Sequence, residues 1–261
     1  MKLAVAGKGG VGKTLLAGTL SRLLARDGYR VLAVDADPAM NLAYAVGVPE
    51  EVASKIVPVA ENRQLIEERA GKLFGEIYTL TPKVDDIADR FGVVGPDGVR
   101  LLVMGTIRYG GSGCMCPANA LIRALISHLT LARDEAIVMD MEAGLEHLGR
   151  GTARGFDALI CVVEPGRQSL ETARKILRLS DHIGIRRVYA VGNKVMDDEG
   201  RRFVQEGVST LGLELLGIIP YDESVQKADV MRVAPIDYSP NSPAIRAIAE
   251  IKQEIVRRLG A

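Results

Sequence analysis

The feature that most constrains the fold of this chain is a glycine-rich segment that joins an apolar run to a helical pattern. The apolar run covers residues 3–6, and the helical pattern covers residues 15–24. The segment between them reads Gly7-Lys8-Gly9-Gly10-Val11-Gly12-Lys13-Thr14. Glycines allow a tight turn whose N–H groups converge on anionic oxygens, and the positive end of the following helix strengthens this attraction. The segment therefore predicts a strand, a phosphate-binding loop and a helix.

The complete spacing G-x-x-x-x-G-K-T assigns roles within this loop. Lys13 is expected to reach the β- and γ-phosphates of a nucleotide, and Thr14 is expected to place its hydroxyl on Mg²⁺. The alternative is that the glycines form only a turn between a strand and a helix. The spacing and its context favour nucleotide binding. The residues expected to contact the nucleotide here are Lys8, Gly9, Gly10, Val11, Gly12, Lys13, Thr14 and Leu15.

Length and composition narrow the class of protein. We expect the 261 residues to form one domain, residues 1–261. Lys plus Arg and Asp plus Glu both number 33, so no basic excess points to nucleic acid. No apolar stretch reaches the ~18 residues that a membrane span needs, and the first strand leaves no room for a signal peptide. These observations predict a cytoplasmic protein with no nucleic-acid or membrane partner.

Apolar runs that alternate with helical patterns predict the fold class. Such alternation is typical of a parallel sheet covered by helices on both faces. We therefore expect a single α/β domain with a mostly parallel sheet of seven or eight strands. Residues 49–98 hold short charged helices and a turn at 92–98, and they carry no motif. The predicted strands cover residues 3–6, 30–34, 99–104, 136–139, 158–163, 187–192 and 213–219.

Two carboxylates follow predicted strands and are candidates for the magnesium site. Asp37 follows the strand at 30–34, and Asp140 follows the strand at 136–139. The carboxyl ends of parallel strands beside a phosphate loop are where Mg²⁺ and an attacking water bind. We expect Asp140 to be the Walker B aspartate, and Asp37 to lie beside the Mg²⁺ and the water. The alternative for Asp37 is a helix cap.

A second candidate site is the pair Cys114 and Cys116, which precedes Pro117 and an amphipathic helix. A helix N-terminus lowers the pKa of a thiol and favours the metal-binding thiolate. Residues two apart in an extended loop can direct both sulfurs to the same side. A local redox pair is the alternative. Cys161 lies inside a predicted strand and is expected in the core, while His147 is interpreted as a switch or interface residue rather than a metal ligand.

The position of Lys8 within the loop adds a family resemblance. The run Lys-Gly-Gly-Val-Gly-Lys-Thr resembles the deviant Walker A motif of the SIMIBI-class ATPases, which include MinD, ParA and the nitrogenase iron protein. The resemblance implies Mg-dependent ATP hydrolysis by a homodimer in which Lys8 reaches the phosphates of the other subunit. It also implies that Lys13 takes part in catalysis and that Asp37 orients the attacking water.

The same resemblance implies where the base of the nucleotide binds. Asn193 and Lys194 follow the strand at 187–192 and match the family's purine-contacting residues, with Asn193 favouring adenine. Pro220 and Tyr221 resemble the loop that closes over the base. An amide suits adenine because it offers both a donor and an acceptor.

Two segments together resemble the CooC-type accessory ATPases, which serve nickel insertion into carbon monoxide dehydrogenase. They are the pair Cys114 and Cys116 and the run 140–151. A similar ATPase serves acetyl-CoA synthase. One pair gives two thiolates, whereas a closed soft-metal site takes about four ligands. We therefore expect two chains to share one Ni²⁺ or Zn²⁺, and the client to be one of these nickel enzymes.

Other functions within this class remain open at this point. One alternative is a MinD- or ParA-like nucleotide switch that acts in positioning, or a scaffold related to iron–sulfur or redox chemistry. Another is a nucleotide-gated sensor that turns ATP over very slowly. The spacing of Cys114 and Cys116 and the position of Cys161 make a shared iron–sulfur cluster the weaker interpretation.

Overall fold

The computed structural model describes residues 1–37, 39–71, 79, 82–105, 116–128, 134–141 and 155–259. Its centre is a sheet of eight strands in the order β3-β4-β2-β5-β1-β6-β7-β8. All neighbouring pairs are parallel except β3 and β4, which are antiparallel. The strands are β1 Lys2–Gly7, β2 Arg30–Ala36, β3 Val93–Val94, β4 Arg100–Val103, β5 Glu135–Met141, β6 Ala158–Val163, β7 Val188–Val195 and β8 Glu214–Pro220.

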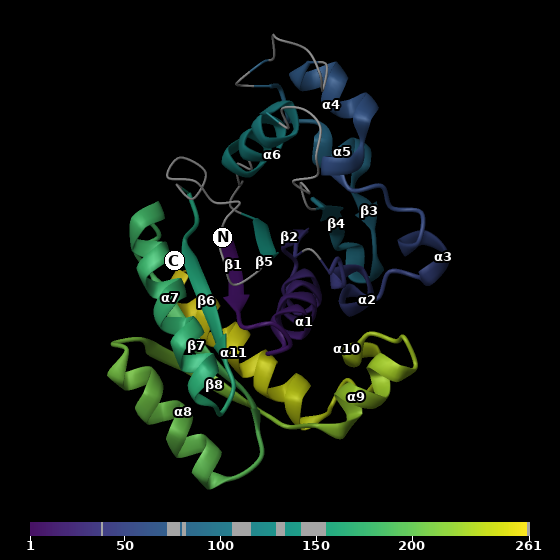
Figure 1. Cartoon of the computed structure of the whole chain (residues 1–261). Helices are drawn as coiled ribbons and strands as arrows, with labels where there is room; N and C mark the ends of the chain where they lie inside the picture. Colours follow the sequence, from purple (N-terminus) through teal and green to yellow (C-terminus); the bar gives the residue numbers. More distant parts are fainter. Residues whose placement is uncertain are drawn as a thin grey trace.

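Helices follow most strands and cover the sheet on both sides (Figure 1). Two 3-10 turns, η1 Val59–Glu61 and η2 Pro96–Gly98, lie among them. The α-helices are α1 Lys13–Arg26, α2 Leu42–Val46, α3 Glu50–Ala53, α4 Arg63–Ala70, α5 Ile87–Phe91, α6 Cys116–His128, α7 Arg167–Ile183, α8 Asp198–Thr210, α9 Glu223–Val230, α10 Pro235–Tyr238 and α11 Pro243–Leu259.

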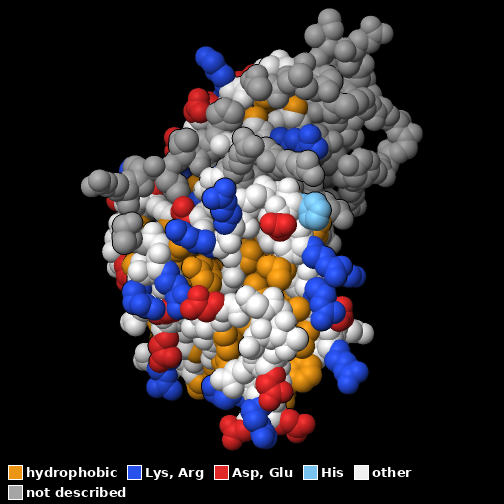
Figure 2. Space-filling view, turned by 90° about the vertical axis from the view of Figure 1, so that its left-hand side faces the viewer, with side chains coloured by type: hydrophobic (Ala, Val, Ile, Leu, Met, Phe, Trp, Pro, Cys, Tyr) orange, Lys and Arg blue, Asp and Glu red, His pale blue; other side chains and the backbone are white. Residues whose placement is uncertain are grey.

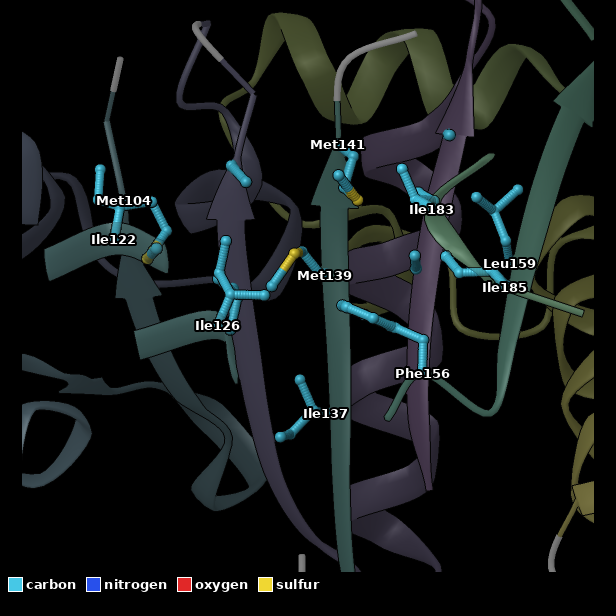
Figure 3. Packing of buried hydrophobic residues seen from close by; sticks show 14 of the residues in the cluster. Met104, Ile122, Ile126, Ile137, Met139, Met141, Phe156, Leu159, Ile183 and Ile185 are labelled. Carbon is cyan, nitrogen blue, oxygen red and sulfur yellow. The ribbon is translucent and has the colours of Figure 1, made fainter. Parts of the chain in front are cut away.

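The central strand β1 is buried on both faces, and this divides the core into two layers. Leu3 and Val5 pack in a cluster with residues of α1, α2 and α11. Ala4 and Ala6 belong to the opposite cluster, which contains residues of α4, α6, α7 and α8. Figure 3 shows part of this second layer, where Met139 of β5 lies near Ile126 of α6. Residues alternate between faces along a strand, so a continuous apolar run is what such a position requires.

The structure confirms the predicted fold class, a single α/β domain with a mostly parallel sheet. One local prediction is wrong: residues 92–98, expected to form only a turn, contain strand β3 before η2. Val93 pairs with Leu101 and Val94 with Arg100, which adds an antiparallel edge strand. A strand of two residues is too short to show an alternating pattern. The turn-forming residues Pro96-Asp97-Gly98 therefore led to the prediction of a turn.

Two surface properties bear on the partners expected from the sequence. On the face shown in Figure 2, Lys and Arg side chains are interspersed with Asp and Glu around a central apolar area. Within the residues described, no helix is both long enough and apolar enough to cross a membrane.

Candidate nucleotide-binding site

The predicted phosphate loop leaves the carboxyl end of β1 and enters α1 at Lys13. Gly12 has a φ of 96°, and a Cβ on this residue would lie 2.1 Å from Nδ2 of Asn193. Glycine suits both features, because a left-handed backbone disfavours a side chain and a Cβ here would displace the Asn193 amide. Gly10 also has a positive φ, of 76°, and the space beside it is open. Gly9 lies in the turn and Leu15 in the first turn of α1, so the loop joins strand and helix as the sequence predicts.

Two side chains of strand β7 donate hydrogen bonds to the backbone of this loop. The buried Asn193 donates from Nδ2 to the backbone oxygen of Val11 at 2.7 Å. Lys194 donates from Nζ to the backbone oxygen of Gly10 at 2.6 Å. Both residues lie inside β7 rather than after it, and sequence reasoning assigned them to the base alone. The structure shows that both side chains hydrogen-bond to the backbone of the phosphate loop.

The residues predicted to act on phosphate and magnesium lie together on the other side of the loop. The Nζ of Lys13 is 3.4 Å from Oδ2 of Asp37, and the Lys13 side chain is only 7% exposed. The hydroxyl of Thr14 donates to Oδ2 of Asp140 at 2.6 Å. The predicted catalytic lysine, the Mg²⁺ hydroxyl and the two aspartates thus occupy one compact site.

A third carboxylate, Asp35, belongs to the same site and was missed by sequence reasoning. It pairs with Asp140 across β2 and β5 and accepts hydrogen bonds from the backbone N–H groups of Leu42 and Asp37. Burial raises the pKa of Asp35 to about 7 and that of Asp140 to about 6. Oδ1 of Asp140 is buried and has no hydrogen-bond partner among the described residues. The signal for Asp35 was its place at a strand end two residues before Asp37.

Lys8 lies on the side of the loop that faces the end of β6. Its Nζ contacts Oε1 of Glu164 at 3.0 Å, and its side chain is 37% exposed. Glu164 follows directly after β6, and no sequence motif marked it. The second oxygen of Glu164 lies 3.9 Å from Nζ of Lys194.

A hollow of about 410 Å³ opens at the end of β8. Tyr221, which follows Pro220, lines it and donates from its hydroxyl to Oε1 of Gln226 at 2.9 Å. The backbone N–H of Tyr221 also donates to the oxygen of Val195, which places the hollow beside the end of β7. The remaining lining residues are Glu223, Lys227, Val230, Met231 and Tyr238.

The predicted metal site falls mostly outside the described residues. Cys114 and His147 are not described, and neither are residues 142–151 of the run 140–151. Cys116 begins helix α6, as the sequence predicted for a residue at a helix N-terminus. Among the residues described, no group of three or more His, Cys, Asp or Glu side chains is arranged to hold a metal. Cys161 is fully buried in β6, which confirms its predicted place in the core, and burial raises its pKa to about 12.

A parallel sheet whose central strand runs into a glycine-rich loop, with carboxylates at the neighbouring strand ends, defines a P-loop nucleotide-binding protein. Residues 2–236 match the CobQ/CobB/MinD/ParA nucleotide binding domain, and the chain belongs to that family. The MinD and ParA resemblance seen in the sequence is therefore confirmed.

Similar proteins agree with this assignment. The chain is 43% identical over 261 residues to an ATP-binding protein of Methanocaldococcus jannaschii, covering 98% of both chains. It is also 43% identical to the carbon monoxide dehydrogenase accessory protein CooC of Rhodospirillum rubrum, covering 92% of this chain and 91% of CooC. The solved structure of the cell division ATPase MinD from Pyrococcus furiosus shares the fold, with a TM-score of 0.70, 21% identity and 98% of both chains covered. The resemblance to CooC-type proteins is confirmed.

Proposed function

We propose that this protein is an ATPase that assists nickel insertion into a carbon monoxide dehydrogenase or an acetyl-CoA synthase, and that it works as an ATP- and metal-linked homodimer. The observation that carries the proposal is the paired arrangement of Lys13 with Asp37 and Thr14 with Asp140. This arrangement occurs in a chain that is 43% identical to CooC over most of its length. The pair Cys114 and Cys116 provides the metal ligands of the proposal.

The phosphates of ATP suit the glycine-rich loop, because the loop offers backbone N–H groups and the ammonium group of Lys13. Lys13 exchanges Asp37 for the β- and γ-phosphates, which carry more negative charge than a single carboxylate. The positive end of α1, which begins at Lys13, faces the same phosphates. ATP and water then give ADP and phosphate.

The residues present also fit Mg²⁺. The free Oδ1 of Asp140 and the hydroxyl of Thr14 are oxygen groups in a buried site, which is the ligand chemistry that Mg²⁺ and its bound waters accept. Mg²⁺ would neutralise charge on the phosphates. Once Lys13 has moved to the phosphates, the carboxylate of Asp37 is free to accept a hydrogen bond from the attacking water and to orient it.

We assign the adenine base to the hollow beside Tyr221. Its volume of about 410 Å³ suits a nucleoside. The rings of Tyr221 and Tyr238 offer apolar contact, and Gln226 offers an amide for the adenine edge. Asn193, Lys194 and Pro220, which the family resemblance also assigns to the base, are not among the residues that line this hollow, and Asn193 already donates one N–H to Val11.

The metal is cargo in this proposal. Cys114 and Cys116 of two subunits would supply four thiolates to one Ni²⁺, with Zn²⁺ as a competitor. The proposal requires one two-fold axis both to bring the cysteine pairs together and to bring each Lys8 towards the nucleotide of the other subunit. ATP and metal would then favour the same dimer.

Two variants test the ATPase part of the proposal. Lys13→Ala should abolish tight ATP binding, because the phosphates lose their cation. Asp37→Ala should still bind Mg-ATP but lose more than tenfold in turnover, a barrier increase of at least about 1.4 kcal/mol. Calorimetry and phosphate release measure the two effects, and Asp85→Ala, an exposed carboxylate outside the site, is the control. Unchanged affinity in Lys13→Ala would contradict the assignment.

The client part is tested by activation of nickel-free carbon monoxide dehydrogenase. With Ni²⁺ and ATP, the wild-type protein should speed activation, and Lys13→Ala should not. Equal activation with both proteins would refute an ATP-driven role and leave only a passive nickel carrier.

A further inference from the structure

The register of the sheet brings Lys8 and Glu164 together. Gly7 pairs with Val162 across the parallel strands β1 and β6. The two strands end side by side, and Lys8, the residue after Gly7, meets Glu164, which lies two residues after Val162, at the carboxyl edge of the sheet. Their side chains form an ion pair of 3.0 Å with exposed fractions of 37% and 21%.

Other contacts fix Glu164 in this position. Its backbone N–H donates at 3.0 Å to the hydroxyl of Ser169, a buried residue in the first turn of α7. On its other side its carboxylate lies 3.9 Å from Nζ of Lys194, which is itself bonded to Gly10 of the phosphate loop. Glu164 is therefore anchored to the scaffold, whereas Lys8 belongs to the loop and has a long, flexible side chain.

We propose that Glu164 is a positioning residue that holds Lys8 within its own subunit, and that ATP-driven dimerisation requires Lys8 to leave this carboxylate for the phosphates of the partner. The inference rests on the proposed role of Lys8 across the dimer. Glu164 and the phosphates of the other subunit compete for one ammonium group, so the ion pair opposes premature association.

The partial exposure of the Lys8–Glu164 ion pair limits its effect on dimerisation. A partly exposed ion pair shifts an equilibrium by up to about fivefold. A symmetric dimer must open two such pairs, so the combined effect on the dimer dissociation constant reaches about 25-fold at most. Glu164 and Lys194 also line a hollow of about 250 Å³, which leaves room for the carboxylate and ammonium groups to separate.

The test is Glu164→Gln, which keeps the size of the side chain and the backbone bond to Ser169 but removes the charge. Sedimentation with a non-hydrolysable ATP analogue should show dimers that are about three- to 25-fold tighter. Binding of the analogue to dilute monomer should be unchanged, because Lys13 is untouched. Glu171→Gln is the matched control, since it removes an exposed carboxylate that pairs only locally with Arg174 on α7. Dimers of unchanged or lower affinity in Glu164→Gln would overturn the proposal.

A second comparison separates this inference from the proposed function. Lys8→Ala should lose ATP-driven dimers, and adding Glu164→Gln should not restore them. Restored dimers would show that Glu164 acts through general repulsion rather than through Lys8. A normal ATP-driven dimer in Lys8→Ala would refute the role of Lys8 across the interface. If Lys8→Ala loses the dimer but Glu164→Gln leaves the dimer affinity unchanged, only the role of Glu164 is refuted.

Discussion

Lys2 offers a test of how burial controls charge in this fold. Its side chain is 2% exposed at the start of β1. Its Nζ donates to the backbone oxygen of Ile126 at 2.7 Å and lies 4.7 Å from the centre of the Phe156 ring, and both residues are labelled in Figure 3. Burial lowers the pKa of Lys2 from 10.5 to about 8, although Asp157 opposes this effect. Because Ile126 lies in the last turn of α6, Lys2 also anchors the helix that begins at Cys116.

The sign and size of the pH effect follow from this pKa. Between pH 8 and 10.5 the unfolded chain binds more protons at Lys2 than the folded chain does, so the free energy of unfolding rises with pH. A pKa of about 8 in place of 10.5 lowers the free energy of unfolding by roughly 3 kcal/mol at low pH. Roughly 2 kcal/mol of this loss is recovered between pH 7.5 and pH 10. The destabilisation is fully present below pH 8 and is relieved as the ammonium group loses its proton.

The perturbation is Lys2→Met, which keeps the length of the side chain and removes the titrating group. Urea denaturation at pH 7.5, 8.5, 9.2 and 10 gives the free energy of unfolding of both proteins. Other titrating groups cancel in the difference, which should move by roughly 2 kcal/mol in favour of the wild type as pH rises. Lys55→Met, which changes an exposed lysine, is the control. A difference that stays constant with pH would refute the reasoning.

Two further predictions concern the metal and the loop. Replacing Cys114 and Cys116 with Ser should remove Ni²⁺ and Zn²⁺ binding and metal-induced dimers but preserve ATP binding; calorimetry that gives one metal per subunit in the wild type would contradict a shared four-sulfur site. Gly12→Ala should lose ATP binding by at least tenfold, because the new Cβ meets Asn193 in a left-handed backbone, while circular dichroism should still show a folded protein. Normal ATP affinity in Gly12→Ala would mean that the contact with Asn193 does not shape the loop.

The sequence predicted those parts of the site that depend on local pattern. The strand, loop and helix around Lys13 follow from glycine spacing and apolar periodicity within about twenty residues. Asp140 was found for the same reason, as a carboxylate at the end of an apolar run. Cys161 was placed in the core because a continuous apolar strand leaves no polar face.

The parts that the sequence did not predict depend on long-range register. Asp35 meets Asp140 only because β2 pairs with β5, although 104 residues lie between the two carboxylates. Glu164 meets Lys8 because β6 rather than β5 lies on that side of β1. The hydrogen bond from Asn193 to Val11 joins residues 182 positions apart. No local pattern specifies these pairs, and each of them changes the interpretation of a predicted residue.

Three side-chain contacts of the phosphate-loop residues bear on how the proposed site would use ATP. Within a subunit Lys13 pairs with Asp37, Lys8 with Glu164, and the hydroxyl of Thr14 with Asp140. In the proposed function, ATP and its Mg²⁺ replace the contacts of Lys13 and Thr14, so the net ATP affinity is a difference between two sets of polar contacts rather than the sum of new ones. In the proposed dimer, Lys13 and Thr14 exchange partners within one subunit, whereas Lys8 gains its new partner only when a second subunit arrives. Under the proposed roles of Lys8 and Glu164, binding of ATP and association of subunits are distinct steps, and the charge on Glu164 affects only the second.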